Sequence, residues 1–146
     1  SDNWLQDGEM KIRKLDEIFE LKNPLKMLQR LIRDHFFLYM SHRDFLKVFL
    51  LDIQLNRRFY SSHVYDAFRS YSSIVESILE EGKKDGSIRP EINNRVFKYL
   101  FLGAFSHLAL RWLLLEKESK RDILEEITEL VFLLCRSVST DGVEVD

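Results

Sequence analysis

The sequence predicts an all-α protein of about six helices packed as an antiparallel bundle. Apolar residues recur at intervals of three, four and seven positions along most of the 146 residues, which is the spacing of amphipathic helices. The chain holds only two prolines and five glycines, and turn signals built from them separate the periodic segments. No segment shows the sustained apolar–polar alternation that is typical of a half-buried strand.

Three helices are expected in the first part of the chain. An amphipathic pattern covers residues 2–21. Asn23 and Pro24 then suit the N-cap and the first position of a second helix, over 24–41. The run 45–55 is short and very apolar, and its poor alternation between strong helical patterns favours a helix over a strand.

Three longer helices are expected to follow. Apolar residues share one face over 57–81, and the glycines and proline of "EGKKDGSIRPEIN" predict a turn after this helix. A helix over 96–116 is expected to have Asn93 or Asn94 as its cap. The last helix should extend to a frayed tail, residues 139–146.

Composition indicates a single folded domain over 1–146, because 45% of the residues are hydrophobic and 12% are aromatic. The formal net charge is −2, from 22 basic and 24 acidic residues without a basic block. This balance gives no electrostatic footprint for a nucleic acid or a membrane surface. The single cysteine, Cys135, lies in an apolar run and is expected to be a core thiol of a protein in the reducing cytoplasm.

The helix expected over 96–116, "VFKYLFLGAFSHLALRWLLLE", is apolar on every side. Its length would suit a membrane span, but Lys98, His107 and Arg111 would then lie in hydrocarbon, where charged groups are costly. We therefore expect a helix of a folded protein that does not enter a membrane. Such a helix must contact two apolar neighbours at once.

No motif with a catalytic mechanism is found. The sequence contains no GxGxxG, phosphate-binding loop, HExxH or paired CxxC. The four histidines, at positions 35, 42, 63 and 107, have neither the i, i+4 spacing of a metal site nor a glutamate three residues before them. We therefore expect a protein that is not an enzyme, with no catalytic residue, no metal site and no cofactor.

Two stretches, "ILEEGKKDGSIRPEIN" (78–93) and "FLGAFSHLALRWLL" (101–114), carry a resemblance to a known family. They are similar in order and spacing to the C-terminal region of TetR-family transcriptional regulators, and most similar to the FadR-like, acyl-CoA-responsive branch. Those regulators commonly show an "EG…G.fr.di" turn, then a helix that carries "GA" and ends near a tryptophan. The resemblance covers roughly residues 23–138.

The resemblance implies the ligand-binding and dimerisation domain of a repressor. TetR regulators begin with a helix-turn-helix domain of about fifty residues, and this sequence shows none. DNA would then be bound only through a missing N-terminal domain, and residues 1–21 would correspond to the connector that follows it. Such a regulator is expected in the cytoplasm.

The resemblance also implies a homodimer, because the last two helices of such regulators pair with their symmetry mates into a four-helix interface. An ordinary intrachain core is the alternative for the stripe of the last helix, since periodicity alone does not name a partner. The expected interface residues are Gly103, Ala104, His107, Leu110, Arg111, Leu114, Leu124, Ile127, Val131 and Leu134.

A hydrophobic pocket is expected between the helices over 24–41, 57–81 and 96–116. Broad apolar faces rich in aromatic residues suit an elongated effector such as a fatty acid or a fatty acyl-CoA. Each apolar residue of this expected pocket could instead belong to an ordinary core. An arginine expected to contact phosphates could instead be simply exposed to solvent. The expected ligand-binding residues are Phe36, Phe37, Met40, Phe49, Ile53, Phe68, Arg69, Tyr71, Phe101, Phe105, Leu108 and Trp112.

Two interpretations stay open at this point. Arg111 could meet an anionic ligand group or pair across the interface with a glutamate such as Glu125 or Glu129. The chain as a whole could also be a helical protein-interaction module without a small-molecule ligand.

Overall fold

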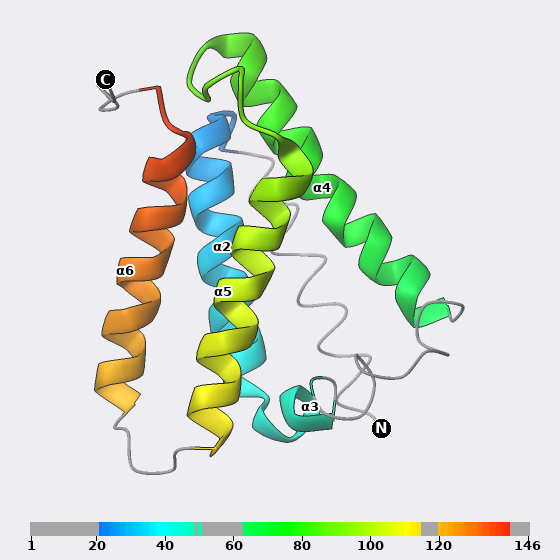
Figure 1. Cartoon of the computed structure of the whole chain (residues 1–146), viewed down its shortest axis with the longest axis vertical. Coiled ribbons are helices and arrows are strands. Elements are labelled where there is room, and N and C mark those ends of the chain that lie inside the picture. The colour runs from blue at the N-terminus through cyan, green and yellow to red at the C-terminus, as the bar shows by residue number, and fades with distance from the viewer. Residues whose placement is uncertain (1–20, 49, 51–62, 115–119, 141–146) are drawn as a thin grey trace.

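The computed structural model describes residues 21–48, 50, 63–114 and 120–140, with side chains except at 63–68, 70–71 and 120–121. The described residues form five helices and no strand (Figure 1). The all-α prediction is therefore confirmed for this part of the chain. The helices are α2 (Pro24–Ser41), α3 (Arg43–Val48), α4 (His63–Asp85), α5 (Asn94–Leu114) and α6 (Lys120–Val138).

The predicted helix bounds agree best where a cap or a turn marks them. The helix expected over 24–41 is α2, whose N-cap Asn23 accepts a hydrogen bond from the Lys26 backbone NH at 3.2 Å. The helix expected over 57–81 instead continues to Asp85 as α4. Of the run expected as a helix over 45–55, the described part belongs mainly to the short α3. The helix expected over 2–21 lies almost entirely outside the described residues.

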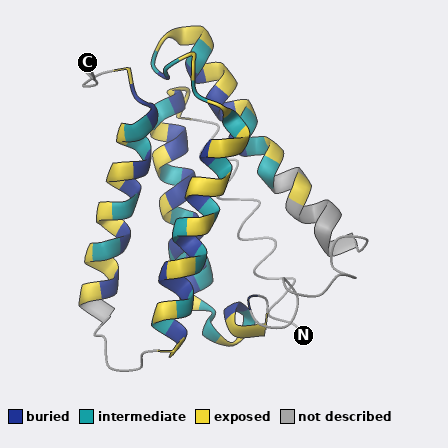
Figure 2. Cartoon of the chain, in the orientation of Figure 1, coloured by how far each residue is buried: buried dark blue, intermediate teal, exposed yellow. Residues whose placement is uncertain are grey.

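Helix α2 lies at the centre of the bundle. It contacts α3, α4, α5 and α6, and Figure 1 shows α5 and α6 side by side and antiparallel in front of it. Leu28, Ile32 and Phe36 of α2 are completely buried, and Figure 2 shows the buried positions of the surrounding helices turned towards it. One hydrophobic core therefore joins all five helices.

The turn between α4 and α5 is determined by two glycines. Gly82 lies inside α4 under the side chain of Ile88, which folds back so that its backbone NH donates to the Gly82 carbonyl at 3.0 Å. Gly86 follows the end of α4 with φ of 85°, a conformation that glycine adopts without steric cost. The "EG…G" pattern thus corresponds to the end of α4 and to a turn in which Ile88 packs closely on Gly82.

The same turn holds the C-terminal end of α6. The Arg89 backbone NH donates to the Val138 carbonyl at 2.9 Å, and its guanidinium donates to the Ser137 carbonyl. Ile88 also forms an isolated bridge with Ser139. The Arg89 guanidinium is favourable here, because the last carbonyls of a helix have no partner within the helix and its C-terminal end carries partial negative charge. The turn is therefore a structural clamp between α4, α5 and α6.

The start of α5 is held from α4. Asn93 accepts hydrogen bonds from the backbone NH groups of Arg95 and Val96 at 3.0 and 3.1 Å, which makes it the cap. Lys83 donates to the Ile92 carbonyl at 2.7 Å and to Asn94 Oδ1 at 2.8 Å. These contacts fix the rotation of α5, and hence which side of it faces the core.

Candidate functional site

An aromatic cluster lies between α2 and α5, where the sequence predicts part of the pocket. Phe36 and Phe105 pack edge-to-face with ring centroids 5.3 Å apart, and Phe101 lies 6.3 Å from Phe36. His35 is buried among them, with its ring 4.5 Å from Phe105 and 5.1 Å from Phe101. Tyr39 extends the cluster, at 4.7 Å from His35. The structure thus joins three of the expected lining residues with two that were not expected.

The other expected lining residues occupy several environments. Met40 and Leu108 are buried, whereas Phe37 and Trp112 are half-buried against the core. Arg69 is exposed on α4. Phe49, Ile53 and the side chains of Phe68 and Tyr71 lie outside the described residues. The described lining residues other than Arg69 therefore belong to the core or pack against it, and the rings that meet between α2 and α5 are called the aromatic wall below.

The C-terminal end of α5 is attached to α3. The Arg43 guanidinium donates to the Leu113 carbonyl at 3.0 Å and lies over the Trp112 ring, 4.9 Å from its centroid. This contact combines a cap of the helix end with a cation–π interaction. Near the N-terminal end of α5, Lys98 pairs with Glu76 of α4 at 2.6 Å. Both contacts hold the aromatic wall in place from neighbouring helices.

The outer side of α5 exposes a continuous apolar stripe. Its residues follow one another at intervals of four, three, four, three and four positions, so they share one face of the helix. Val96, Leu100 and Leu114 on this face are 58%, 53% and 69% exposed. The whole stripe is Val96, Leu100, Gly103, His107, Leu110 and Leu114. Helix α5 is therefore apolar on two opposite sides, one in the core and one outside.

The interface residues expected on α5 lie on or beside this outer stripe. Gly103, His107, Arg111 and Leu114 are exposed, and Ala104 and Leu110 are half-buried. A Cβ added at Gly103 would meet nothing within 4 Å. Another helix could therefore approach α5 closely at this position.

The residues expected at an interface on α6 divide into two groups. Ile127, Val131 and Leu134 are buried within this chain, in the core that α6 shares with α2 and α5. Leu124 is 45% exposed. Phe132 and Leu133, which are not among the expected interface residues, are each 61% exposed. The apolar side chains that α6 exposes are therefore different from the stripe with the clearest helical spacing.

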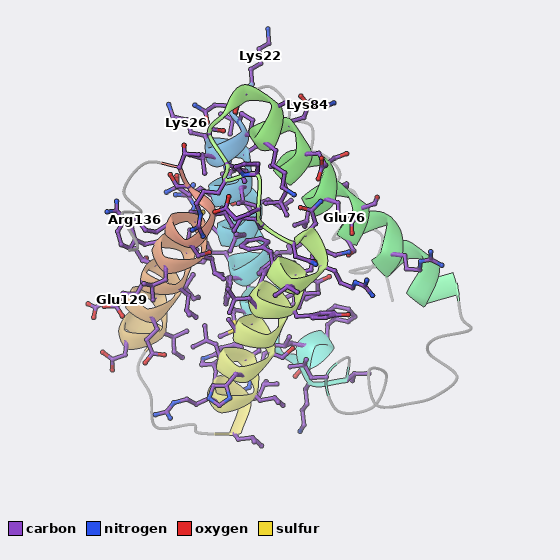
Figure 3. All side chains as sticks on the ribbon, turned by 45° about the horizontal axis from the view of Figure 1, so that its top comes forward. Lys22, Lys26, Glu76, Lys84, Glu129 and Arg136 are labelled. Atoms are coloured by element: carbon purple, nitrogen blue, oxygen red, sulfur yellow. The ribbon has the colours of Figure 1, made fainter. Side chains whose placement is uncertain are left out.

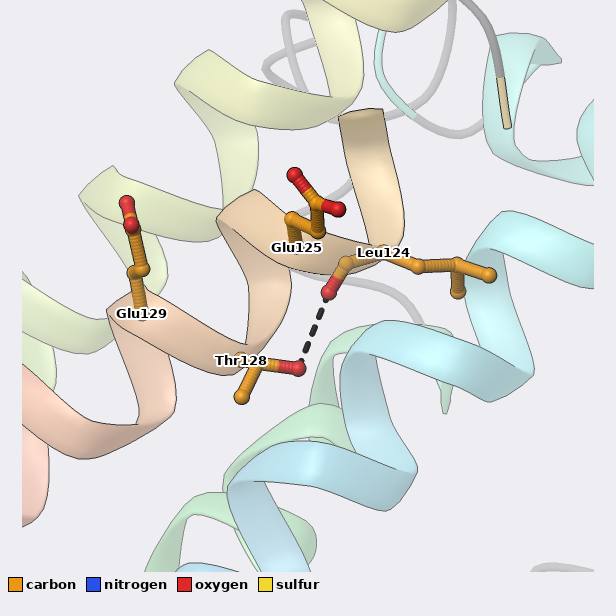
Figure 4. Close-up of a pocket in the computed structure, with 4 residues that line it drawn as sticks. All are labelled: Leu124, Glu125, Thr128 and Glu129. Atoms are coloured by element: carbon orange, nitrogen blue, oxygen red, sulfur yellow. Dashed lines mark hydrogen bonds between the residues drawn. The ribbon is translucent and has the colours of Figure 1, made fainter. Parts of the chain in front are cut away.

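The outer surface of α6 also carries charge. Glu129 and Arg136 project away from the bundle (Figure 3), and Arg136 lies 5.9 Å from the centre of the Phe132 ring. A shallow, open depression on α6 is lined by Leu124, Glu125, Thr128 and Glu129 (Figure 4). The Thr128 hydroxyl there donates to the Leu124 carbonyl at 3.0 Å. The depression is open to solvent and is separate from the aromatic wall.

No group of three or more His, Cys, Asp or Glu side chains among the described residues could hold a metal ion. Burial raises the pKa of the Cys135 thiol to about 12, so this thiol is protonated at neutral pH and is a poor nucleophile. None of the described helices has the length and apolar character of a membrane span.

Comparison with known protein families identifies the domain. Residues 8–137 match the family TetR_C_4, described as YsiA-like protein, C-terminal region. The chain belongs to this TetR family. It is a TetR-type regulatory domain, as the resemblance carried by the "EG…G" turn and the "GA" helix implied.

Solved structures share the fold of the TetR domain. One is a crystal structure of the transcriptional regulator FadR from Bacillus subtilis in complex with stearoyl-CoA, with a TM-score of 0.74 and 21% identity over 89% of this chain and 69% of that chain. Another is the fatty acid degradation regulator FadR from Bacillus halodurans, with a TM-score of 0.70 and 16% identity over 97% of this chain and 72% of that chain. No curated protein matches the sequence significantly.

Proposed function

We propose that this TetR domain binds a fatty acyl-CoA against the aromatic wall between α2 and α5 and dimerises through the outer faces of α5 and α6. The observation that carries the proposal is the two-sided character of α5. Its inner side presents Phe101, Phe105 and Leu108 to α2, and its outer side exposes an apolar stripe. A helix placed this way joins a ligand to a subunit interface.

The chemistry of the wall favours an apolar chain. Each methylene removed from water contributes about 0.8 kcal/mol, so a twelve-carbon chain offers roughly 10 kcal/mol before the cost of association. The likeness to a FadR that binds stearoyl-CoA supports an acyl-CoA within this class. Arg69, which is exposed on α4, is the residue expected to contact the phosphates of coenzyme A.

The outer face supports a second copy of this chain as the partner. Intervals of four and three are those of helices that pack against each other along their length. Basic Arg111 on α5 and acidic Glu125 and Glu129 on α6 are complementary when the two copies meet in an isologous contact. We assign to this interface the expected residues that are exposed or half-buried, and add Val96, Leu100 and Leu133.

Regulation would follow from a change in helix packing. A chain held between α2 and α5 would favour one arrangement of these helices, and the DNA-binding segments of a complete, cytoplasmic repressor would follow that arrangement. The ligand must bind the two arrangements with different affinity, because equal affinity shifts no equilibrium however tight it is.

Calorimetric titration with acyl-CoAs of increasing chain length tests the proposed ligand. We expect dodecanoyl-CoA to bind more tightly than octanoyl-CoA, since four more methylenes contribute at most about 3 kcal/mol. Coenzyme A alone should give no measurable heat, and the free fatty acids separate the contribution of the chain from that of the carrier. Equal affinity across the series, or no binding, would remove the acyl-CoA assignment.

A substitution in the aromatic wall tests whether the acyl-CoA binds there. Phe105→Leu keeps an apolar side chain but removes the ring that packs against His35, Phe36 and Tyr39. We expect about fivefold weaker binding of dodecanoyl-CoA, because an aromatic contact contributes about 1 kcal/mol beyond its buried area. Val48→Ala, at an exposed position on α3, is the control and should bind as the native protein does.

A further inference from the structure

His107 is the only ionisable residue among the six positions of the outer stripe on α5. Leu110 follows it and Gly103 precedes it by one turn, while Leu100 and Leu114 lie toward the two ends of the stripe. The imidazole is exposed in the single subunit. It therefore lies near the middle of the surface that the proposed dimer encloses, so this inference rests on the proposed function.

His107 lies one turn from Gly103, where a partner helix could pack closely against α5 and cover the imidazole. Nothing lies within 4 Å of the point where a Cβ of Gly103 would be, so the partner helix can reach the backbone of α5 there. In an isologous dimer each patch meets the corresponding patch of the other copy, so both copies of His107 enter the interface together. Two imidazoles are then withdrawn from water in one association step.

A permanent cation lies close to His107 on the outer face of α5. Arg111, one turn further along α5, carries a permanent charge of the same sign. It also competes with the imidazole for the carboxylates of α6, which are Asp122, Glu125, Glu126 and Glu129.

Two charged groups of the other helices packed on α5 contact other parts of it. Glu76 of α4 contacts Lys98, and Arg43 of α3 contacts the Leu113 carbonyl. From α2, His35 contacts the inner rings of α5, on the side opposite the stripe. The enclosed site is thus mainly apolar and already has a fixed cation nearby.

We propose that His107 makes dimerisation of this domain dependent on pH, with the neutral imidazoles enclosed in the dimer and the protonated ones exposed in separated subunits. Histidine is the side chain whose charge ordinarily changes between pH 5 and 8. Burial of a charge without a partner is unfavourable, so protonation favours the monomer. Association then releases protons, and the dimer weakens as the pH falls through this range.

Sedimentation equilibrium of the whole chain at pH 7.5 and pH 5.5 tests the proposal. For the native protein we expect the dimer dissociation constant to be about tenfold to a hundredfold higher at pH 5.5, since up to two protons are taken up on dissociation. His107→Gln keeps a polar side chain but removes the titration, so its dissociation constant should change less than about threefold between the two pH values. His42→Gln, at the end of α2, should keep the pH dependence of the native protein.

The outcomes separate this inference from the proposed dimer. A native protein that is dimeric with the same dissociation constant at both pH values overturns the role of His107 and leaves the dimer intact. The same conclusion follows if His107→Gln keeps the native pH dependence, or if acid strengthens the dimer. A native protein that is monomeric at both pH values overturns the proposed dimer and this inference together.

Discussion

Replacing Leu100 and Leu114 together by glutamate is expected to convert the protein from a dimer to a monomer. Both side chains are more than half exposed on the outer stripe of α5, so a single subunit should fold with the substitutions. In the dimer they would place four carboxylates in an apolar interface, and each enclosed, unpaired charge costs several kcal/mol. We expect the dissociation constant to rise at least about a hundredfold, as measured by sedimentation velocity.

A matched control separates the stripe from a general effect of added charge. Leu21→Glu also introduces an acidic group at an exposed apolar position, where 40% of the residue is accessible, but it lies before α2 and is not part of the stripe on α5. It should sediment as the native dimer does. The assignment of the interface to α5 would be wrong if the Leu100→Glu, Leu114→Glu variant remained a dimer with native circular dichroism.

Replacing Gly82 by alanine is expected to destabilise the fold by about 1–3 kcal/mol, the usual range for an overpacked core. The new methyl carbon would lie 2.9 Å from the Cβ of Ile88 and closer still to the Cγ1 and Cδ1 atoms. Ile88 is completely buried and its backbone NH donates to the Gly82 carbonyl, while its chain neighbours Ser87 and Arg89 are hydrogen-bonded to the end of α6 and the residues after it, so it has little room to move. The clash therefore outweighs the gain of up to about 1 kcal/mol that alanine brings to a helix interior.

Urea unfolding followed by circular dichroism measures this effect. The exposed Ser77→Ala, on the same helix, is the control, and its free energy of unfolding should stay within about 0.5 kcal/mol of the native value. A Gly82→Ala variant as stable as the native protein would show that the clamp around Ile88 adapts easily. The "EG…G" turn would then not depend on close packing at this glycine.

The sequence was most informative where local chemistry decides the structure. The Asn23–Pro24 pair predicted the start of α2, and Asn93 was one of two caps expected for α5. The end of α4 was harder to predict, because Gly82 reads as a helix stop. Its role is instead to admit the side chain of Ile88, a contact made after the chain turns back. A packing contact of this kind leaves no local signal in the sequence.

The two sides of α5 and α6 show a different limit. Periodicity groups residues on one face but does not say whether the same chain or another covers it. Ile127, Val131 and Leu134 therefore fitted an interface and a core equally well, and they lie in the core. The four-and-three spacing from Val96 to Leu114 was present in the sequence and could have marked the exposed stripe. It was hidden because α5 is apolar all around.

The aromatic wall could be predicted only in part. Phe36, Phe101 and Phe105 were expected from apolar faces and do meet between α2 and α5. His35 was not selected, because a polar side chain in an apolar stripe does not show by itself that it will be buried among rings. Whether the wall binds a ligand depends on the shape of the space beside it, which residue types do not determine.

The proposed function requires a dimer of this chain that binds one acyl-CoA in each subunit. Native mass spectrometry of the purified protein incubated with stearoyl-CoA tests it most directly, because a single spectrum gives both the number of chains and the number of ligands. We expect the mass of two chains carrying two acyl-CoA molecules, and two chains without ligand after incubation with coenzyme A alone. A single chain, or a dimer that retains no acyl-CoA, would contradict the claim.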